Sequence, residues 1–222
     1  MSVPYAPIIQ RSDPNATTRT IQGIVLDMDG TITHPILDFA LMRTRLAIPS
    51  TTDILHHLHS LSGSALTEAT KIIHDMEHEA MLAMTVQEGF SPLMRFVQSR
   101  DPKMPKAIFT RNRADCVDWL RETFCEKDGF TFDIILTRDF LPVKPDPAGL
   151  VHIAKEWNID PTSLMMVGDS KDDMQCARGA GAVGVLLRND HNADVETLAD
   201  LVVHDLEEIV GLLEKGFTVQ RQ

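Results

Sequence analysis

The sequence predicts an α/β protein with a doubly wound, mostly parallel sheet and a small helical insertion after its first strand. Three observations lead to this prediction. The chain has short, continuous apolar runs of strand length, helical patterns that alternate with the later runs, and one long helical interval between the first two runs. Continuous apolar runs are typical of strands that are buried on both faces of a parallel sheet.

The predicted strands are rich in Val, Ile, Leu, Met and Phe. Five of them, with a sixth that we expect at a sheet edge, cover residues 21–26, 106–110, 133–137, 164–168, 183–187 and 201–203. Helical patterns accompany the later runs at residues 114–125, 147–157, 172–180 and 206–215. Strands that alternate with helices are joined by right-handed crossovers, which produces a doubly wound sheet.

One interval breaks this alternation. Roughly 80 residues separate the first predicted strand from the second, whereas a crossover needs little more than a dozen. The interval has three helical patterns of its own, at residues 38–46, 52–61 and 65–84. We therefore expect an α/β core domain made of residues 20–34 and 93–222, with residues 35–92 inserted as a helical cap over the end of the first strand.

Charge and composition restrict the partners. The formal net charge of -11 argues against a nucleic-acid partner, because binding a phosphate backbone needs clustered Lys and Arg. No membrane association is expected either, since the apolar runs are much shorter than the roughly 20 residues of a membrane span. The three cysteines are scattered and odd in number, so we expect free thiols and a cytoplasmic location. The oligomeric state stays open.

The first 19 residues contain three prolines and many polar residues, and they lack the apolar segment of a secretory signal. We interpret residues 1–19 as a disordered tail. Arg11 and Arg19, with Asp13 as the single acid, leave a mitochondrial presequence as the alternative interpretation.

Acidic residues follow two of the predicted strands directly. Asp27 and Asp29 end the first strand, and Asp169 and Asp173 follow the fourth. The carboxyl ends of strands face the crevice where open α/β sheets bind ligands, and the first and fourth strands can be neighbours there. Carboxylates placed so close together need a counter-charge, and a hard divalent cation would supply it.

Two other residues are expected at the same edge. Thr110 ends the second strand and offers a hydroxyl group. Lys144 lies in a turn just before a predicted helix, and the two prolines that follow it, Pro145 and Pro147, would restrict the direction of its side chain.

These motifs resemble those of the haloacid-dehalogenase-like (HAD) hydrolase superfamily, in its phosphoglycolate-phosphatase-like branch. The four motifs occur in the expected order: Asp27-x-Asp29-Gly30-Thr31, Thr110 after an apolar strand, Lys144, and Gly168-Asp169-Ser170-x-x-Asp173. The resemblance covers roughly residues 21–190 and implies a Rossmann-like core with a cap.

The resemblance implies a covalent mechanism. Asp27 would attack phosphorus as the nucleophile and form an aspartyl-phosphate. Asp29 would act as general acid for the leaving group and then as general base for water. Because dehalogenases of this superfamily need neither the second aspartate nor a metal, the presence of Asp29 favours phosphoryl transfer.

The resemblance also implies a Mg²⁺ site and a phosphate site. The side chains of Asp27 and Asp169 and the backbone carbonyl of Asp29 would bind Mg²⁺, with Asp173 orienting these ligands. Thr110 and the backbone at Arg111 would hold phosphate oxygens, with the Arg111 side chain as a further candidate for substrate binding. Lys144 would offset the negative charge.

We expect a Mg²⁺-dependent phosphatase that hydrolyses a small phosphorylated metabolite. Two alternatives remain: a phosphomutase that uses the same core residues, and a non-catalytic protein that binds a phosphorylated metabolite. The intact motif set favours an enzyme over the binding protein.

Overall fold

The computed structural model describes residues 2–7, 19–35, 37–100 and 102–220. The chain forms two compact units, of which the larger combines Met1–His34 with Val86–Gln222 and the smaller is Pro35–Thr85. The larger unit resumes at Val86, whereas the sequence analysis placed this return at residue 93.

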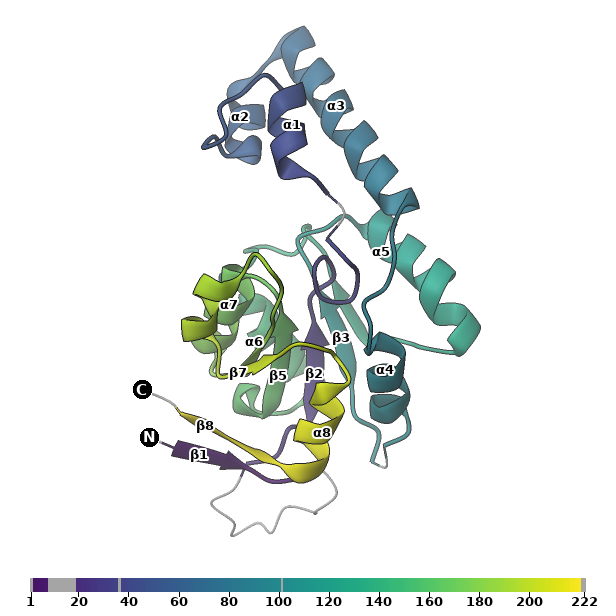
Figure 1. The fold of residues 1–222 in the computed structure, drawn as a ribbon, viewed down its shortest axis with the longest axis vertical. Coiled ribbons are helices and arrows are strands. Elements are labelled where there is room, and N and C mark those ends of the chain that lie inside the picture. The colour runs from purple at the N-terminus through teal and green to yellow at the C-terminus, as the bar shows by residue number, and fades with distance from the viewer. Residues whose placement is uncertain (1, 8–18, 36, 101, 221–222) are drawn as a thin grey trace. The chain divides into compact units, whose positions relative to one another are not determined.

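A six-stranded parallel sheet forms the centre of the larger unit (Figure 1). Its strands are β2 (Gly23–Leu26), β3 (Lys106–Phe109), β4 (Ile134–Leu136), β5 (Leu164–Gly168), β6 (Val183–Leu187) and β7 (Leu201–Val203). Their order across the sheet is β4-β3-β2-β5-β6-β7, with every neighbouring pair parallel. This arrangement confirms the predicted doubly wound α/β fold.

The centre of the sheet is a topological switch point. Leu26 of β2 pairs with Ile108 of β3 on one side and with Val167 of β5 on the other. The backbone N–H of Asp27 continues this pairing by donating to the Val167 carbonyl oxygen at 2.9 Å. Ligands bind beyond the carboxyl ends of the strands at such a point, and this is where the chain places Asp27.

Helices cover both faces of the sheet. One face packs against α6 (Ala148–Trp157) and α7 (Lys171–Ala180). The core on this face includes Val25, Phe109 and Met166 from the strands, with Ile153 and Ala177 from the helices. On the other face, α4 (Phe90–Gln98) and α8 (Glu208–Lys215) contact one another (Figure 1).

Shorter elements complete the connections. The helix α5 (Ala114–Leu120) continues into a π-helical turn, η1 (Arg121–Cys125), and then into the 3₁₀ turn η2 (Glu126–Asp128). The 3₁₀ turns η3 (Pro161–Ser163) and η4 (Ala193–Leu198) precede β5 and β7.

The sequence analysis did not predict α4 as a helix. Its buried residues Phe90, Leu93, Met94 and Val97 are spaced three, four and seven positions from the first, as on one face of an amphipathic helix. The predicted insertion, residues 35–92, includes the first residues of this helix. The helix instead belongs to the larger unit.

The smaller unit consists of three helices around its own apolar cluster. They are α1 (Phe39–Arg45), α2 (Ile54–Ser60) and α3 (Gly63–Leu82), close to the predicted helical patterns. Met42, Ile54 and Met76 are the buried members of the cluster. Asp38 and Asp53 cap the first two helices by accepting backbone N–H groups of Leu41 and His56, which satisfies donors that a helix start leaves free.

The two ends of the chain pair with each other, which corrects the prediction of a disordered tail for part of the N-terminus. Strand β1 (Ser2–Tyr5) pairs antiparallel with β8 (Phe217–Gln220) (Figure 1). Tyr5 stacks on Phe217 with ring centroids 4.9 Å apart, and its hydroxyl group donates to the Thr162 carbonyl oxygen at 3.1 Å. Residues 8–18 lie outside the described residues, and they include Arg11 and Asp13, on which the alternative interpretation as a presequence depends.

All three cysteines are free, as expected, and the structure buries them. Among the described residues, no helix combines the length and the apolar character that crossing a membrane requires.

Candidate active site

The turn after β2 brings two distant chain segments into contact. Asp27 is buried at the end of the strand, and Gly30 has a positive φ of 80°. A Cβ atom at Gly30 would lie 2.2 Å from Oδ2 of Asp169, so a larger residue there would collide with the Asp169 carboxylate. The backbone of the first motif therefore lies directly against the acid that follows β5.

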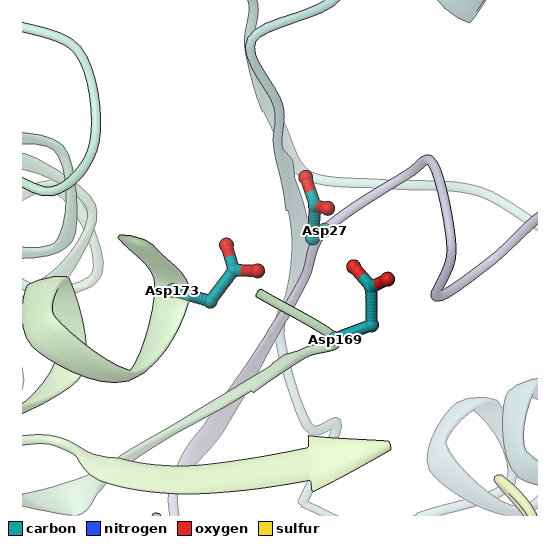
Figure 2. A group of neighbouring side chains, drawn as sticks. All are labelled: Asp27, Asp169 and Asp173. Atoms are coloured by element: carbon teal, nitrogen blue, oxygen red, sulfur yellow. The ribbon is translucent and has the colours of Figure 1, made fainter. Parts of the chain in front are cut away.

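Three carboxylates converge at this point. Asp27, Asp169 and Asp173 each offer one oxygen atom, and these atoms lie within 4.8 Å of one another. Figure 2 shows the three side chains as neighbours that come from three separate segments of the chain. The structure thus brings Asp27 and Asp169 together, and Asp173, which the sequence analysis expected to orient the metal ligands, lies beside them.

A single buried lysine faces this acidic group. Nζ of Lys144 donates to Oδ1 of Asp27 and to Oδ1 of Asp173, both at 2.6 Å. The ammonium group also lies 5.3 Å from the centroid of the Phe109 ring, which adds a cation–π contact. Three carboxylates and one ammonium leave two negative charges uncompensated when all four groups are ionised.

Burial and the neighbouring charges shift the pKa values of Asp27, Asp169 and Lys144. Burial raises the pKa of Asp27 to about 8; Lys144 opposes the rise and Asp173 adds to it. Burial, with Asp173 again adding, raises the pKa of Asp169 to about 7. Burial alone would lower the pKa of Lys144, but the two carboxylates outweigh it and raise the pKa. Without a further cation, the site holds protons at neutral pH.

The capping of α7 fixes Asp173. Its Oδ2 accepts the backbone N–H of Ser170 at 3.1 Å and the Ser170 hydroxyl at 2.6 Å. The Ser170 hydroxyl oxygen in turn accepts the backbone N–H of Asp173, which completes a capping box. Both carboxylate oxygens of Asp173 are therefore engaged by protein donors.

The side chain of Asp29 lies in a different environment. It is exposed, and its Oδ2 accepts a hydrogen bond from Nδ2 of Asn112 at 2.7 Å. Oδ1 of Asn112 accepts the backbone N–H of Arg113 at 2.8 Å, which sets the orientation of the amide. The sequence analysis missed Asn112, although its position two residues after Thr110 could have suggested it.

Thr110 and Arg111 lie on the same loop but differ in exposure. Thr110 is buried, and its Oγ1 accepts the backbone N–H of Asn112 at 3.0 Å, so its proton is available for another acceptor. The Arg111 side chain is 58% exposed, and its Nη1 donates to Oδ2 of Asp172 at 2.6 Å. Arg111 is thus engaged by an acid of α7 and not by the three-carboxylate group.

A parallel sheet with buried carboxylates and a lysine at its switch point defines a class of α/β hydrolases. A family model described as haloacid dehalogenase-like hydrolase matches residues 49–186 of the chain. A haloacid dehalogenase-like hydrolase domain-containing protein of Arabidopsis thaliana is 36% identical over 221 residues, covering 91% of this chain and 87% of that protein. The chain therefore belongs to the haloacid dehalogenase-like hydrolase family.

Two further similarities refine this assignment. A phosphoglycolate phosphatase of Chromobacterium violaceum is 29% identical over 226 residues, covering 88% of this chain and 98% of that protein. The crystal structure of a predicted phosphoglycolate phosphatase from Haemophilus somnus matches the fold with a TM-score of 0.68 at 17% identity, covering 86% of this chain and 97% of that one. Within this family, the chain is thus similar to phosphoglycolate phosphatases in sequence and in fold.

Proposed function

We propose that the protein is a Mg²⁺-dependent phosphatase that hydrolyses a small phosphomonoester through an aspartyl-phosphate on Asp27. The observation that carries this proposal is the charge of the site. Asp27, Asp169 and Asp173 face one ammonium group, that of Lys144, and two negative charges are left over. One divalent cation would neutralise them, and carboxylate oxygens are ligands that Mg²⁺ prefers.

The donor set fits such a cation. We expect Asp27, Asp169 and the backbone carbonyl of Asp29 to hold it. Asp173 orients the site, because both of its carboxylate oxygens already accept hydrogen bonds from Lys144 and Ser170. When bound, Mg²⁺ would offset the charge of the carboxylates and of the phosphate.

In the first half-reaction, a carboxylate oxygen of Asp27 bonds to phosphorus while the bond from phosphorus to the leaving oxygen breaks. Asp29 gives its proton to that oxygen, so the product leaves as an alcohol. The Thr110 hydroxyl and the Lys144 ammonium stabilise phosphoryl oxygens during the transfer. Positive charge in a buried site has a large effect on this step, because little water competes with it.

In the second half-reaction, Asp29 takes a proton from water and the oxygen of that water bonds to phosphorus. The bond between phosphorus and Asp27 breaks, which releases inorganic phosphate and restores the carboxylate. Asn112 holds Asp29 through the 2.7 Å hydrogen bond and thereby fixes the position of the group that both half-reactions need.

The helical unit Pro35–Thr85 is the part of the chain that we expect to select the leaving group, as a cap. A cap that closes over substrate also excludes bulk water from the reaction. The Arg111 side chain would reach a substrate anion only after leaving Asp172, with which it pairs in the structure.

Replacing the nucleophile tests the proposal. Asp27→Asn should reduce Mg²⁺-stimulated release of inorganic phosphate from 4-nitrophenyl phosphate to background, while the circular dichroism spectrum stays that of the wild type. Asp118→Asn is the matched control, because Asp118 is an exposed acid of α5 that pairs only with Arg121 among the contacts the structure describes. Substantial activity of Asp27→Asn would refute the nucleophile assignment.

The same assay separates the alternatives. Release of inorganic phosphate from a panel of small phosphorylated metabolites supports the phosphatase, and an isomerised sugar phosphate without net release identifies a phosphomutase. A wild-type protein that turns over no substrate at any Mg²⁺ concentration would leave the binding protein as the remaining interpretation.

A further inference from the structure

The loop after β6 contacts Asp169, the acid that follows β5, through two asparagine side chains. Asn192, on this loop, is 6% exposed and uses all of its amide hydrogen-bonding capacity. Its Nδ2 donates to the backbone carbonyl oxygens of Asp169 at 2.8 Å and Leu187 at 2.9 Å. Its Oδ1 accepts the backbone N–H of Asn189 at 2.9 Å and Nη1 of Arg188 at 3.3 Å. A buried asparagine thus ties the ends of β5 and β6 together.

Asn189 contacts the same acid through its side chain. Its Nδ2 donates to Oδ2 of Asp169 at 3.3 Å. Its Oδ1 accepts the backbone N–H of His191 at 2.9 Å. Because the oxygen of this amide meets a backbone donor, the nitrogen must be the atom that faces the carboxylate.

The two asparagines hold Asp169 at two separate points, the backbone carbonyl and one carboxylate oxygen. The Gly30 backbone lies against the same carboxylate, so the side chain has little freedom to rotate. Neither asparagine contacts Oδ1 of Asp169, so neither would compete with a ligand at that oxygen.

We propose that Asn189 and Asn192 are positioning residues that fix the Asp169 carboxylate for binding of the divalent cation. This inference rests on the proposed function, because it takes Asp169 to be a metal ligand. Donors to a ligating carboxylate restrict its orientation before the metal arrives, and their loss typically weakens metal affinity by roughly 10–100-fold. Asn189 acts on the side chain, whereas Asn192 acts on the backbone and on the position of Asn189.

The test measures metal affinity without turnover, because a residue that only closes the loop would not alter it. Mn²⁺, which takes the same oxygen ligands as Mg²⁺, is titrated into wild type and Asn189→Ala and its free concentration is followed by electron paramagnetic resonance. We expect Asn189→Ala to raise the Mn²⁺ dissociation constant by about 10-fold or more. The melting temperature in EDTA should stay within about 2 °C of the wild type, since the 3.3 Å contact is long and partly exposed.

Two further variants sharpen the result. Asp190→Asn, an exposed acid in the same loop, should leave Mn²⁺ affinity within about twofold of the wild type. Asn192→Ala should weaken Mn²⁺ binding and also lower the melting temperature in EDTA, because it leaves buried carbonyl oxygens without donors.

The outcomes separate this inference from the proposed function. If the wild type binds Mn²⁺ and Asn189→Ala binds it with the same affinity, the positioning role is wrong and the proposed function stands. If the wild type binds no Mn²⁺ and Mg²⁺ does not stimulate its phosphatase activity, the proposed function itself fails.

Discussion

Two lysines are buried at opposite ends of the same parallel sheet. Lys144 lies at the carboxyl end with its side chain 3% exposed, and Lys106 begins β3 at the amino end with its side chain 0% exposed. A buried ammonium group is costly unless it is paired, so both positions require an explanation. The two ends of the sheet give different ones.

At the carboxyl end, hydrogen bonds and charge compensate Lys144. Two carboxylates accept from its ammonium group at 2.6 Å, and their charge raises its pKa above the ordinary range. The acids outnumber the lysine, so the whole group is one divalent cation short of neutrality.

At the amino end, Lys106 has no hydrogen-bond partner for Nζ among the described residues. Oδ2 of Asp133 lies 4.0 Å away, but that oxygen accepts the backbone N–H of Lys106, and Oδ1 accepts from Lys103 at 3.0 Å. Burial therefore dominates and lowers the pKa of Lys106. The two lysines thus differ in how their charge is compensated. At the carboxyl end, where we propose that the reaction takes place, two carboxylates accept hydrogen bonds from Lys144. At the amino end, the fold accommodates Lys106 without a hydrogen bond to its Nζ among the described residues.

Among the changes that test this comparison, Lys144→Met should have the largest effect on activity and stability. Lys144→Met should lower kcat by roughly 10²–10³-fold, because a buried charge that stabilises the transition state is lost. It should also lower the free energy of unfolding in EDTA by about 3–5 kcal/mol, since it leaves Asp27 and Asp173 without their partner. Urea denaturation and phosphate release measure the two effects.

The same lysine-to-methionine change at position 106 is the matched control for Lys144→Met. A wild-type free energy of unfolding in Lys144→Met would show that the carboxylates do not need the ammonium group, and the contrast between the two ends of the sheet would be lost.

A change of pH in the absence of metal should have an intermediate effect on the stability of the protein. The pKa of Asp27 is raised from 3.8 to about 8 and that of Asp169 from 3.8 to about 7, with burial as the main cause. The folded protein therefore binds more protons than the unfolded chain between about pH 4 and 8, and its stability should fall as pH rises through this window. In EDTA the melting temperature should drop from pH 5.5 to 8, by roughly 2–4 °C for each kcal/mol lost.

Two comparisons check the origin of this effect. Asp169→Asn should flatten the pH dependence, because it removes one of the competing charges. Added Mg²⁺ should raise the melting temperature more at pH 8 than at pH 5.5, since protons compete with the cation. A melting temperature in EDTA that rises over the same window would contradict the assigned cause.

The parts of the fold that the sequence predicted are those with a strong local signal. Strand β5 and strand β6 are continuous apolar runs, and both were predicted with their observed bounds. Helix α4 has an equally clear apolar spacing and could have been found. Strand β1 could not, because its pairing with β8 depends on contacts across almost the whole chain. Ser2–Tyr5 has only four residues, one of them a proline, so it offers no local pattern that favours a strand.

The residues of the candidate site also fall into those that the sequence could place and those that depend on contacts between distant parts of the chain. Motif residues at strand ends, such as Asp27 and Asp169, could be placed because a parallel sheet brings the carboxyl ends of neighbouring strands together. Asn189 and Asn192 could not be placed, since their partner Asp169 lies on another strand and asparagine in a loop is usually a turn residue. The pairing of Arg111 with Asp172 was also missed, because it joins the loop after β3 to the first turn of α7 through the long arginine side chain.

The smallest expected effect is that of Lys106→Met. Methionine matches the length of much of the lysine side chain and removes a buried charge whose Nζ has no hydrogen bond among the described residues. Asp133 keeps Lys103 and a backbone N–H group as hydrogen-bond donors, so the substitution leaves no carboxylate without a partner. Replacing such a weakly paired buried charge is often neutral or stabilising, and we expect the free energy of unfolding to change by less than about 1 kcal/mol or to rise.

Phosphatase activity should stay within about twofold of the wild type, because the residue lies at the end of β3 that faces away from the carboxylates. A loss as large as that of Lys144→Met would mean that the amino end of the sheet also depends on a buried ion pair, and that the 4.0 Å separation from Asp133 understates their interaction.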